Sequence, residues 1–152
     1  MKWTIPLIVS LFLISCTNGV VIDQYKAVAD DGWKRTDTLC FRVPPVPQTA
    51  DYDISLGIRH TNAFPYEGIW IVAETRLQHP KAFRHDTLYF VLCDKRGMPV
   101  GKGVNLIQAV TPLNRMRFVK GQSGSIRLRQ IMSREVIPGI SEVGVQVRKG
   151  GF

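Results

Sequence analysis

Two aspartates and a glycine-rich loop come closest, in residue type and spacing, to the residues of an enzyme site. Asp51 and Asp53 stand two positions apart in a segment of alternating polarity, so on a strand their carboxylates would share one face about 7 Å apart. That separation is in the range of an inverting glycosidase pair, although solvated acids at a strand end share the same pattern. The loop from Gly97 to Gly103 has one residue too few for a phosphate-binding loop and lacks its Ser or Thr, so we interpret it as a β-turn.

The three histidines do not have the spacing of a known metal site. His60, His79 and His85 are far apart in sequence, and no predicted helix would bring two of them onto one face. The G-x-S-x-G signature of a serine nucleophile is also missing from the sequence. We therefore expect no metal, no cofactor and no catalytic residues. A hydrolase that uses Asp51 and Asp53 is the enzymatic alternative.

The clearest chemical signal in the sequence is a cysteine that follows a short apolar run. The run from Ile5 to Ile14 comes after Lys2 and is too short to span a bilayer, as in a signal peptide. It ends in Leu13-Ile14-Ser15-Cys16, the pattern of a bacterial lipoprotein signal. A thiol is a good nucleophile for lipid transfer, and the small Ser15 leaves the peptidase access to the bond before Cys16. We therefore expect Cys16 to carry the lipid, with an ordinary secretory signal as the alternative.

The charge balance narrows the class of partner. The 152 residues are 45% hydrophobic and 21% charged, as in globular proteins, and the formal net charge is +8, or +7 once Lys2 leaves with the signal peptide. An exported protein does not normally meet nucleic acid, so we expect no nucleic-acid partner. The polyanions in reach are lipid head groups, acidic glycans and acidic patches on proteins. Solubility alone is the simpler explanation of the charge.

The remaining two cysteines allow two interpretations. A disulfide between Cys40 and Cys93 could persist in an oxidising compartment. Each cysteine lies among apolar residues, however, and a free cysteine behaves as a small hydrophobe. We therefore favour two buried, unpaired thiols over a disulfide.

Strand patterns dominate the rest of the chain. The clearest runs from Tyr52 to His60, where apolar and polar residues alternate. Further strands are expected over residues 20–28, 37–43, 69–77, 87–93, 104–110, 115–119, 125–132 and 143–147. The segment 87–93 is apolar on both faces, as in a central strand, and 133–137 could form one helical turn.

Many short strands with turn signals between them predict an all-β fold, a β-sandwich or jelly-roll-like single domain, with a closed barrel as the alternative. We divide the chain into a lipoprotein signal peptide (1–15), a lipid anchor, tether and first strand region (16–35) and the β-sandwich domain (36–152).

Two sets of side chains are candidates for partner binding. Phe64, Tyr66 and Trp70 cluster around a proline turn, where rigid aromatic rings could contact a protein or a sugar, although we favour a core position for Trp70. Four arginines point away from the apolar faces of their segments and would form a basic stripe if those strands pair, with a solvated sheet face as the alternative. They are Arg115, Arg117, Arg127 and Arg129.

Several short motifs, in order over residues 36–148, resemble the gliding motility lipoprotein family GldH. They are Arg59-His60-Thr61, Phe64-Pro65-Tyr66, Ile69-Trp70, the glycine turn of Asp94, Gly97, Gly101 and Gly103, and a C-terminal group of Gln130, Met132, Gly139-Ile140 and Val143-Gly144-Val145. The chain departs from the family pattern at Ser133 and Pro138, beside the C-terminal group.

The resemblance implies a membrane-anchored, non-catalytic lipoprotein of the gliding motility and type IX secretion machinery of the cell envelope, with no catalytic residues to carry over. Its implied partners are other envelope lipoproteins or membrane proteins of that apparatus. No acidic run directly follows Cys16, which favours a periplasm-facing anchor, in the outer rather than the inner membrane. The alternative is a glycan-binding jelly-roll module of the envelope that stacks sugars on Trp33, Tyr66 or Trp70.

Overall fold

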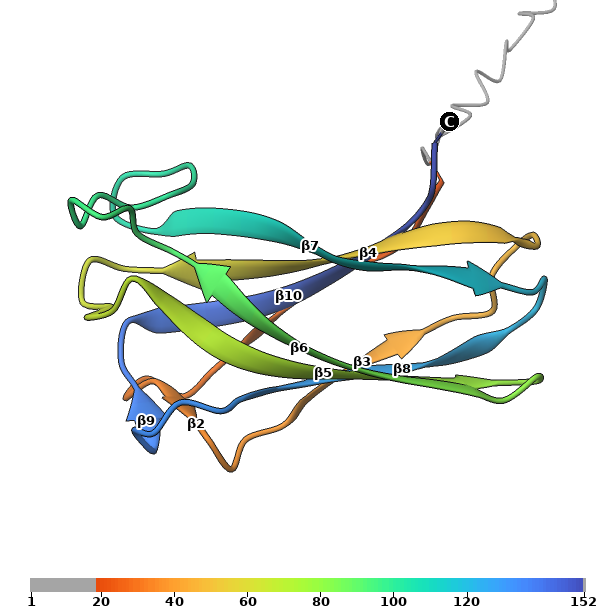
Figure 1. Ribbon diagram of the computed structural model, residues 1–152, viewed down its shortest axis with the longest axis horizontal. Helices are drawn as coiled ribbons and strands as arrows, with labels where there is room; N and C mark the ends of the chain where they lie inside the picture. Colours follow the sequence, from red (N-terminus) through yellow and green to blue (C-terminus); the bar gives the residue numbers. More distant parts are fainter. Residues whose placement is uncertain (1–18, 152) are drawn as a thin grey trace, which may run out of the picture.

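Alternating apolar and polar residues form ten strands within residues 19–151, the part of the chain that the computed structural model describes. Figure 1 shows two packed antiparallel sheets of four strands each. The first sheet has the order β1 (Val20–Ala27), β10 (Ile140–Lys149), β4 (Ala50–His60), β7 (Ile107–Phe118). The second has the order β3 (Leu39–Val43), β8 (Ser123–Gln130), β5 (Gly68–Gln78), β6 (Ala82–Val91). A small ribbon pairs β2 (Trp33–Lys34) with β9 (Val136–Ile137).

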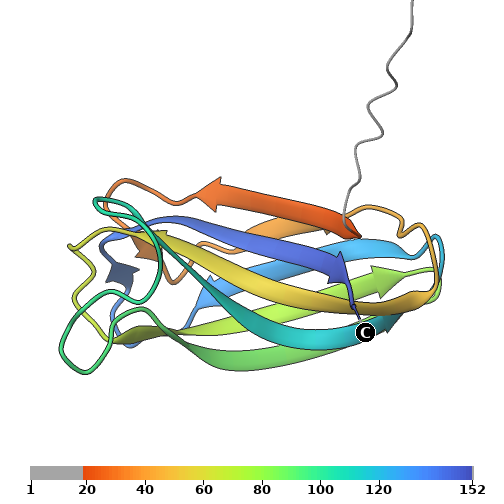
Figure 2. The same ribbon diagram turned by 90° about the horizontal axis from the view of Figure 1, so that it is seen from above.

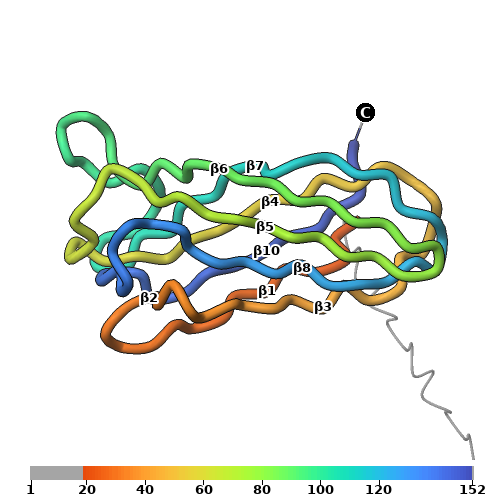
Figure 3. Tube along the Cα trace, turned by 60° about the horizontal axis from the view of Figure 1, so that its bottom comes forward, coloured from red at the N-terminus to blue at the C-terminus, as the bar shows by residue number. Residues whose placement is uncertain are grey.

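The strand pairs are nested in the sequence, which identifies the sandwich as a jelly roll. The hairpin β5–β6 lies innermost, β4 pairs with β7, β3 pairs with β8, and β1 pairs with β10. Successive pairs alternate between the sheets, as when one long hairpin is wrapped around a common core. Figure 2 shows the first sheet from above and Figure 3 shows the second sheet in front. The predicted all-β sandwich is confirmed.

The core lies between the sheets and comes from the inward residue of each alternating pair. In β4 the side chains of Ile54, Leu56 and Ile58 are fully buried between the sheets, and Ser55 and Gly57 between them lie on the outer side of the strand. In β8 Ile126 and Leu128 are buried, and the residues between them face solvent. Each such aliphatic side chain contributes about 1.5–3 kcal/mol by leaving water. The same alternation that builds the core therefore fixes which side chains lie on the two outer faces.

One local prediction is wrong: the segment 133–137 forms no helical turn. Its last two residues are β9, in which Ile137 pairs with the buried Trp33. Gly139 then turns the chain with a φ of 82°, and the Thr61 amide donates to the Gly139 carbonyl at 2.8 Å. Pairing with a strand a hundred residues away outweighs the weak local preference for a turn of helix.

Two strand predictions also change, both at sheet edges. The segment 87–93 lies largely in β6, which is an edge strand and not a central one, so that Tyr89 and Val91 face solvent. The two weak strands expected at 104–110 and 115–119 are one strand, β7, with a register shift at Pro112. An edge strand tolerates proline because its outward amide needs no partner. β1 pairs with β10, so the sandwich begins before residue 36.

The described termini lie at one end of the sandwich, and two long connections lie at the other. At one end, which we call the tether end, the Lys149 amide donates to the Gly19 carbonyl at 2.8 Å, so both described termini leave there. At the opposite far end lie the connections 61–67, between β4 and β5, and 92–106, between β6 and β7 (Figure 1).

Candidate functional site

The two aspartates that suggested catalysis lie opposite two of the candidate arginines. β4 pairs with β7 so that Asp53 faces Arg115 and Asp51 faces Arg117. The Arg115 guanidinium donates to both Asp53 oxygens, at 2.6 and 3.0 Å, and the Arg117–Asp51 pair is longer, at 3.5 Å. The hydrogen bond from Arg115 holds the pKa of Asp53 below its ordinary value. The arrangement is that of cross-strand ion pairs, and the lowered pKa of Asp53 does not suit this residue for the acid of a glycosidase pair, which needs a raised pKa.

The outer face of the first sheet is occupied by the protein's own side chains. The Tyr25 ring lies over Gly57 and Gly144, where a Cβ on either glycine would overlap the ring. The Arg59 guanidinium stacks 4.0 Å from the ring centroid of Tyr25 and donates to Glu142 at 2.7 Å. Burial raises the pKa of the Tyr25 phenol. We call this surface, made of these five residues and the Asp53–Arg115 and Asp51–Arg117 pairs, the closed face.

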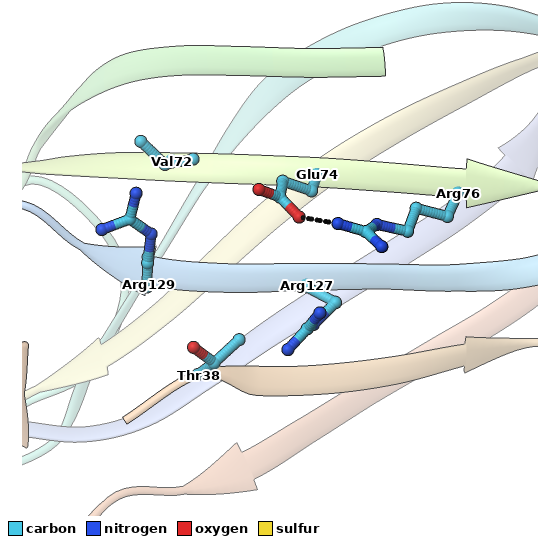
Figure 4. Close-up of a pocket in the computed structure, with 6 residues that line it drawn as sticks. All are labelled: Thr38, Val72, Glu74, Arg76, Arg127 and Arg129. Atoms are coloured by element: carbon cyan, nitrogen blue, oxygen red, sulfur yellow. Dashed lines mark hydrogen bonds and ion pairs between the residues drawn. The ribbon is translucent and has the colours of Figure 1, made fainter. Parts of the chain in front are cut away.

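The outer face of the second sheet is different, and Figure 4 shows its centre. Arg127 and Arg129 point outward from β8, because Ile126, Leu128 and Gln130 take the inward positions. With residues of β5 and Thr38 they surround a shallow pocket of about 190 Å³. The lining residues are Thr38, Val72, Glu74, Arg76, Arg127 and Arg129. We call this surface the open face.

The charges of the open face are not balanced. Three arginines and one glutamate line the pocket, so its formal charge is +2. Glu74 accepts from Arg76 at 3.0 Å. No Asp or Glu within residues 19–151 forms an ion pair with Arg127 or Arg129. Two guanidiniums therefore remain available to an anionic group from outside.

The four candidate arginines do not form one stripe. Arg115 and Arg117 lie on β7 in the first sheet, whereas Arg127 and Arg129 lie on β8 in the second. The two strands do not pair, and their outward side chains point from opposite sides of the sandwich. The connection β7–β8 is a short hairpin in sequence, but it crosses from one sheet to the other.

The candidate aromatic cluster separates into buried and exposed rings. Phe64 is in the core, packed edge-on against His60, and Tyr66 is half-buried against Phe64. Trp70, which we expected in the core, is 46% exposed on the outer face of β5. Its ring contacts that of Tyr89 on β6, with the centroids 5.1 Å apart. Of the three candidates, Phe64 is therefore buried, Tyr66 is half-buried and Trp70 is exposed. Tyr89, which was not a candidate, is exposed beside Trp70.

Of the proposed sugar platforms, Trp33 is fully buried, with its indole nitrogen donating to the Asp37 carbonyl at 3.1 Å. A ring without an exposed face cannot stack on a sugar. Trp70 and Tyr89 are exposed, with their ring planes tilted by 49°. A single exposed ring can stack on a sugar, so Trp70 leaves the glycan-binding alternative open.

Cys40 and Cys93 are both free thiols. They belong to opposite edges of the second sheet, Cys40 on β3 and Cys93 just after β6. Three strand spacings of about 4.8 Å separate these edges, which is beyond the Cα separation of about 7 Å that a disulfide allows. Cys40 is exposed and not buried as expected, whereas burial raises the pKa of the half-buried Cys93 thiol.

His60 is buried beside Phe64 at the far end of β4. Burial lowers its pKa, so the ring is neutral; Nδ1 lies 3.2 Å from the Thr61 carbonyl oxygen, and Nε2 has no partner within residues 19–151. Over the same residues no three His, Cys, Asp or Glu side chains gather closely enough to hold a metal ion.

The far end carries exposed apolar side chains that were not among the candidates from the sequence. Asp94 builds a turn there: the Gly97 amide donates to its carbonyl at 2.9 Å, and the amides of Arg96 and Met98 donate to its carboxylate. The bond from Met98 holds the pKa of Asp94 below its usual value. The exposed residues of the connection are Met98, Val100, Val104 and Leu106. The sequence pattern that could have revealed them is a set of apolar residues in a segment whose glycines disfavour a regular strand.

A known protein family matches most of the chain. The model of the GldH lipoprotein family matches residues 20–147, which include all ten strands except the end of β10. The chain belongs to the GldH lipoprotein family. It is 23% identical to the gliding motility lipoprotein GldH of Flavobacterium johnsoniae, over 95% of this chain and 94% of that protein. It is 21% identical to a GldH homolog of Christiangramia forsetii, over 89% and 87%.

The residues that carry the resemblance to the GldH family mostly build the far end. The buried Gln130 amide donates to the carbonyls of Trp33 and Glu135 and accepts from the Met132 amide, which holds the β2–β9 corner. At Gly139 a Cβ would overlap the Phe64 backbone. These residues therefore position the connections and not a reactive group.

Cys16, the expected lipid-bearing residue, and the signal peptide expected before it lie outside the described residues. The described chain begins at Gly19, three positions later, at the tether end. Within the described residues there is no helix with the length and apolar character needed to cross a membrane.

Proposed function

We propose that this GldH-family protein is a lipid-anchored, non-catalytic component of the gliding motility and type IX secretion machinery and acts through contacts with other envelope proteins. The observation that carries the proposal is the family match over nearly the whole folded domain, residues 20–147. The two relatives are named as a gliding motility lipoprotein and its homolog, and they cover most of the chain. The cross-strand pairing of Asp51 and Asp53 supports the absence of chemistry at those residues.

The anchor follows from Cys16. Three residues extend at most about 11 Å, so a lipid on Cys16 holds Gly19 and the tether end close to the membrane surface. The long axis of the sandwich then carries the far end away from the lipid. We place the anchor in the outer membrane with the domain facing the periplasm, since no acidic run follows the cysteine.

The exposed apolar residues at the far end support protein contacts. Val104 is 84% exposed, and Met98, Val100 and Leu106 lie in the same connection. Exposed apolar side chains that gather in one place, rather than singly, are a common mark of a protein interface. In the anchored protein this connection is the part held farthest from the membrane.

Palmitate labelling of cells that express the protein tests the anchor. Wild type is expected to take up label and to partition into detergent, and Cys16→Ala is expected to lose the label. Cys40→Ala is the matched control, because it removes an exposed thiol from the folded domain and leaves the signal intact. Label that persists in Cys16→Ala, or that is lost equally in Cys40→Ala, would contradict lipidation at Cys16.

Mild crosslinking in native membranes, followed by affinity purification, then tests the assembly role. Proteins of the motility and secretion apparatus are expected with wild type and Cys40→Ala but not with Cys16→Ala. Recovery of glycan without any envelope protein would contradict the proposal and support the glycan-binding alternative.

A further inference from the structure

Arg127 and Arg129 are outward-facing arginines that form no ion pair within residues 19–151. On the first sheet Arg59, Arg115 and Arg117 each have a carboxylate partner. On the second sheet Arg127 and Arg129 form no ion pair within residues 19–151, because Glu74, which lies opposite Arg127, bonds to Arg76. Both arginines line the pocket with Val72 and Thr38. Arginine presents a planar set of donors that matches a carboxylate in bidentate geometry. The open face is therefore a preformed receptor for carboxylates.

The size of the pocket limits what fits. Pockets for small molecules usually enclose about 300–1,000 Å³, whereas this one offers about 190 Å³. That space suits single acidic side chains and not a buried oligosaccharide. Arg127 and Arg129 are two residues apart on β8, about 6.6 Å, which equals the spacing of alternate side chains in an extended peptide.

An apolar contact lies directly beside the arginines. Arg129 pairs in register with Val72, and Trp70 is the next outward residue on β5, so Arg129 and Trp70 are diagonal neighbours about 7–8 Å apart. Trp70 and Tyr89 are both more than 40% exposed. Exposed Trp, Tyr and Arg in one place are the residue types that dominate binding energy at protein interfaces.

The edge of the same sheet is less suited to a partner. Arg84 and Asp86 of β6 point toward the first sheet, where Asn114 of β7 donates to Asp86 at 2.6 Å. Inward-pointing charges on an edge strand discourage the pairing of another strand. The β6 edge is therefore less suited to an added strand than the open face is to a ligand.

We propose that the open face binds an acidic, extended segment of a partner protein, with carboxylates on Arg127 and Arg129 and an apolar side chain on Trp70 and Tyr89. The inference rests on the proposed function in one respect, that the partner is another envelope protein. The charge of the open face supplies the complementarity, since the pocket carries +2 without a ligand.

The test uses the full-length lipoprotein purified in detergent and a fluorescent peptide of alternating glutamate and serine that ends in tryptophan. Arg127→Gln/Arg129→Gln is expected to weaken binding by about tenfold or more, as expected for the loss of two charge-assisted contacts. Trp70→Ala is expected to weaken it less. The matched control Arg115→Gln/Arg117→Gln removes the same charge from the closed face and is expected to change affinity by less than about twofold.

An equal loss in both double variants would overturn the proposal, because it would show attraction to net charge alone. Tighter binding of phosphatidylglycerol vesicles or of polygalacturonate through the same two arginines would also overturn it in favour of a lipid or glycan. Arg127→Lys/Arg129→Lys keeps the charge without the planar donors and is expected to recover only part of the affinity. The assay is independent of lipidation, so this inference can fail while the anchor and the membrane complex stand.

Discussion

The two outer faces of the sandwich use arginine in opposite ways. On the closed face Arg59 stacks on Tyr25 and bonds to Glu142, and Arg115 is paired with Asp53. On the open face Arg127 and Arg129 have no carboxylate partner within residues 19–151. Both faces are built from the same alternation of inward and outward residues. The difference lies in the ion pairs that form: Asp53 bonds to the arginine opposite it, whereas Glu74, which lies opposite Arg127, bonds to Arg76 on its own strand.

The side chains of the closed face contact one another and stabilise the fold, whereas Arg127 and Arg129 of the open face form no ion pair within residues 19–151. A guanidinium that is already paired with a carboxylate has fewer donors and less uncompensated charge for a second anion, whereas an unpaired one loses only water on binding. The glycines sharpen the contrast: Gly57 and Gly144 admit the Tyr25 ring to the closed face, whereas the open face has Val72 and Glu74 at its centre. The closed face is covered by the chain's own side chains, whereas the open face keeps a pocket lined by three arginines.

The largest expected effect on stability comes from adding a methyl group to Gly144, beneath the Tyr25 ring. Gly144→Ala places a Cβ against the ring and displaces both Tyr25 and the Arg59 that stacks on it. We expect the free energy of unfolding, measured by urea denaturation, to fall by about 1–3 kcal/mol. In a Tyr25→Ala background the same substitution should cost much less, because the ring it strikes is gone. Equal costs in the two backgrounds would show that the ring does not close this face.

A smaller effect is expected from Arg59 itself. Arg59→Ala removes the stack on Tyr25 and the bonds to Glu142 and Gln108, so the urea midpoint should fall, though by less than for Gly144→Ala. Arg59→Lys keeps the charge but loses the planar stack and the fork, and should recover only part of the loss. Full recovery with lysine would mean that charge alone holds the closed face.

The smallest effect is expected from Asp53, and it depends on pH. Because its folded pKa is lowered, chiefly by the hydrogen bond from Arg115, the pair stabilises the fold above the ordinary pKa of 3.8 and loses this effect as pH falls through the folded pKa. Asp53→Asn should therefore lower the free energy of unfolding near pH 7 by at most about 0.5 kcal/mol, since both side chains are exposed. The difference from wild type should vanish in acid. A difference that grows in acid would contradict the pairing.

Much of the fold could be predicted from local pattern. Tyr52 to His60 and the valines 143, 145 and 147 alternate strictly, and both segments are central strands of the first sheet. The segment 87–93 was misplaced because an apolar run fits a central strand and an edge strand equally well. Val136 and Ile137 were missed because two residues carry no period, and their strand exists only through β2.

The candidate site was harder to predict than the fold. Outward positions for all four arginines follow from alternation, but whether Arg115 meets an acid depends on the register of β4 against β7. Trp70 was expected in the core at a corner of the sandwich, whereas its place in β5 points it outward. Cys40 and Cys93 could have paired by composition, and the strand order of the second sheet prevents it.

The sequence by itself determined the all-β character and the family, because period, turn residues and motif order are local properties of the chain. The sequence also predicts that Cys16 carries a lipid, because the apolar run and the residues directly before the cysteine are a local pattern as well. Only the tertiary structure decided which arginines are paired and which are free. Alternation states the side of a strand on which a residue lies, but whether a charged side chain forms an ion pair depends on the neighbouring strand and on competing partners: Glu74 lies opposite Arg127, yet it bonds to Arg76. In a jelly roll the neighbouring strand comes from a distant part of the sequence.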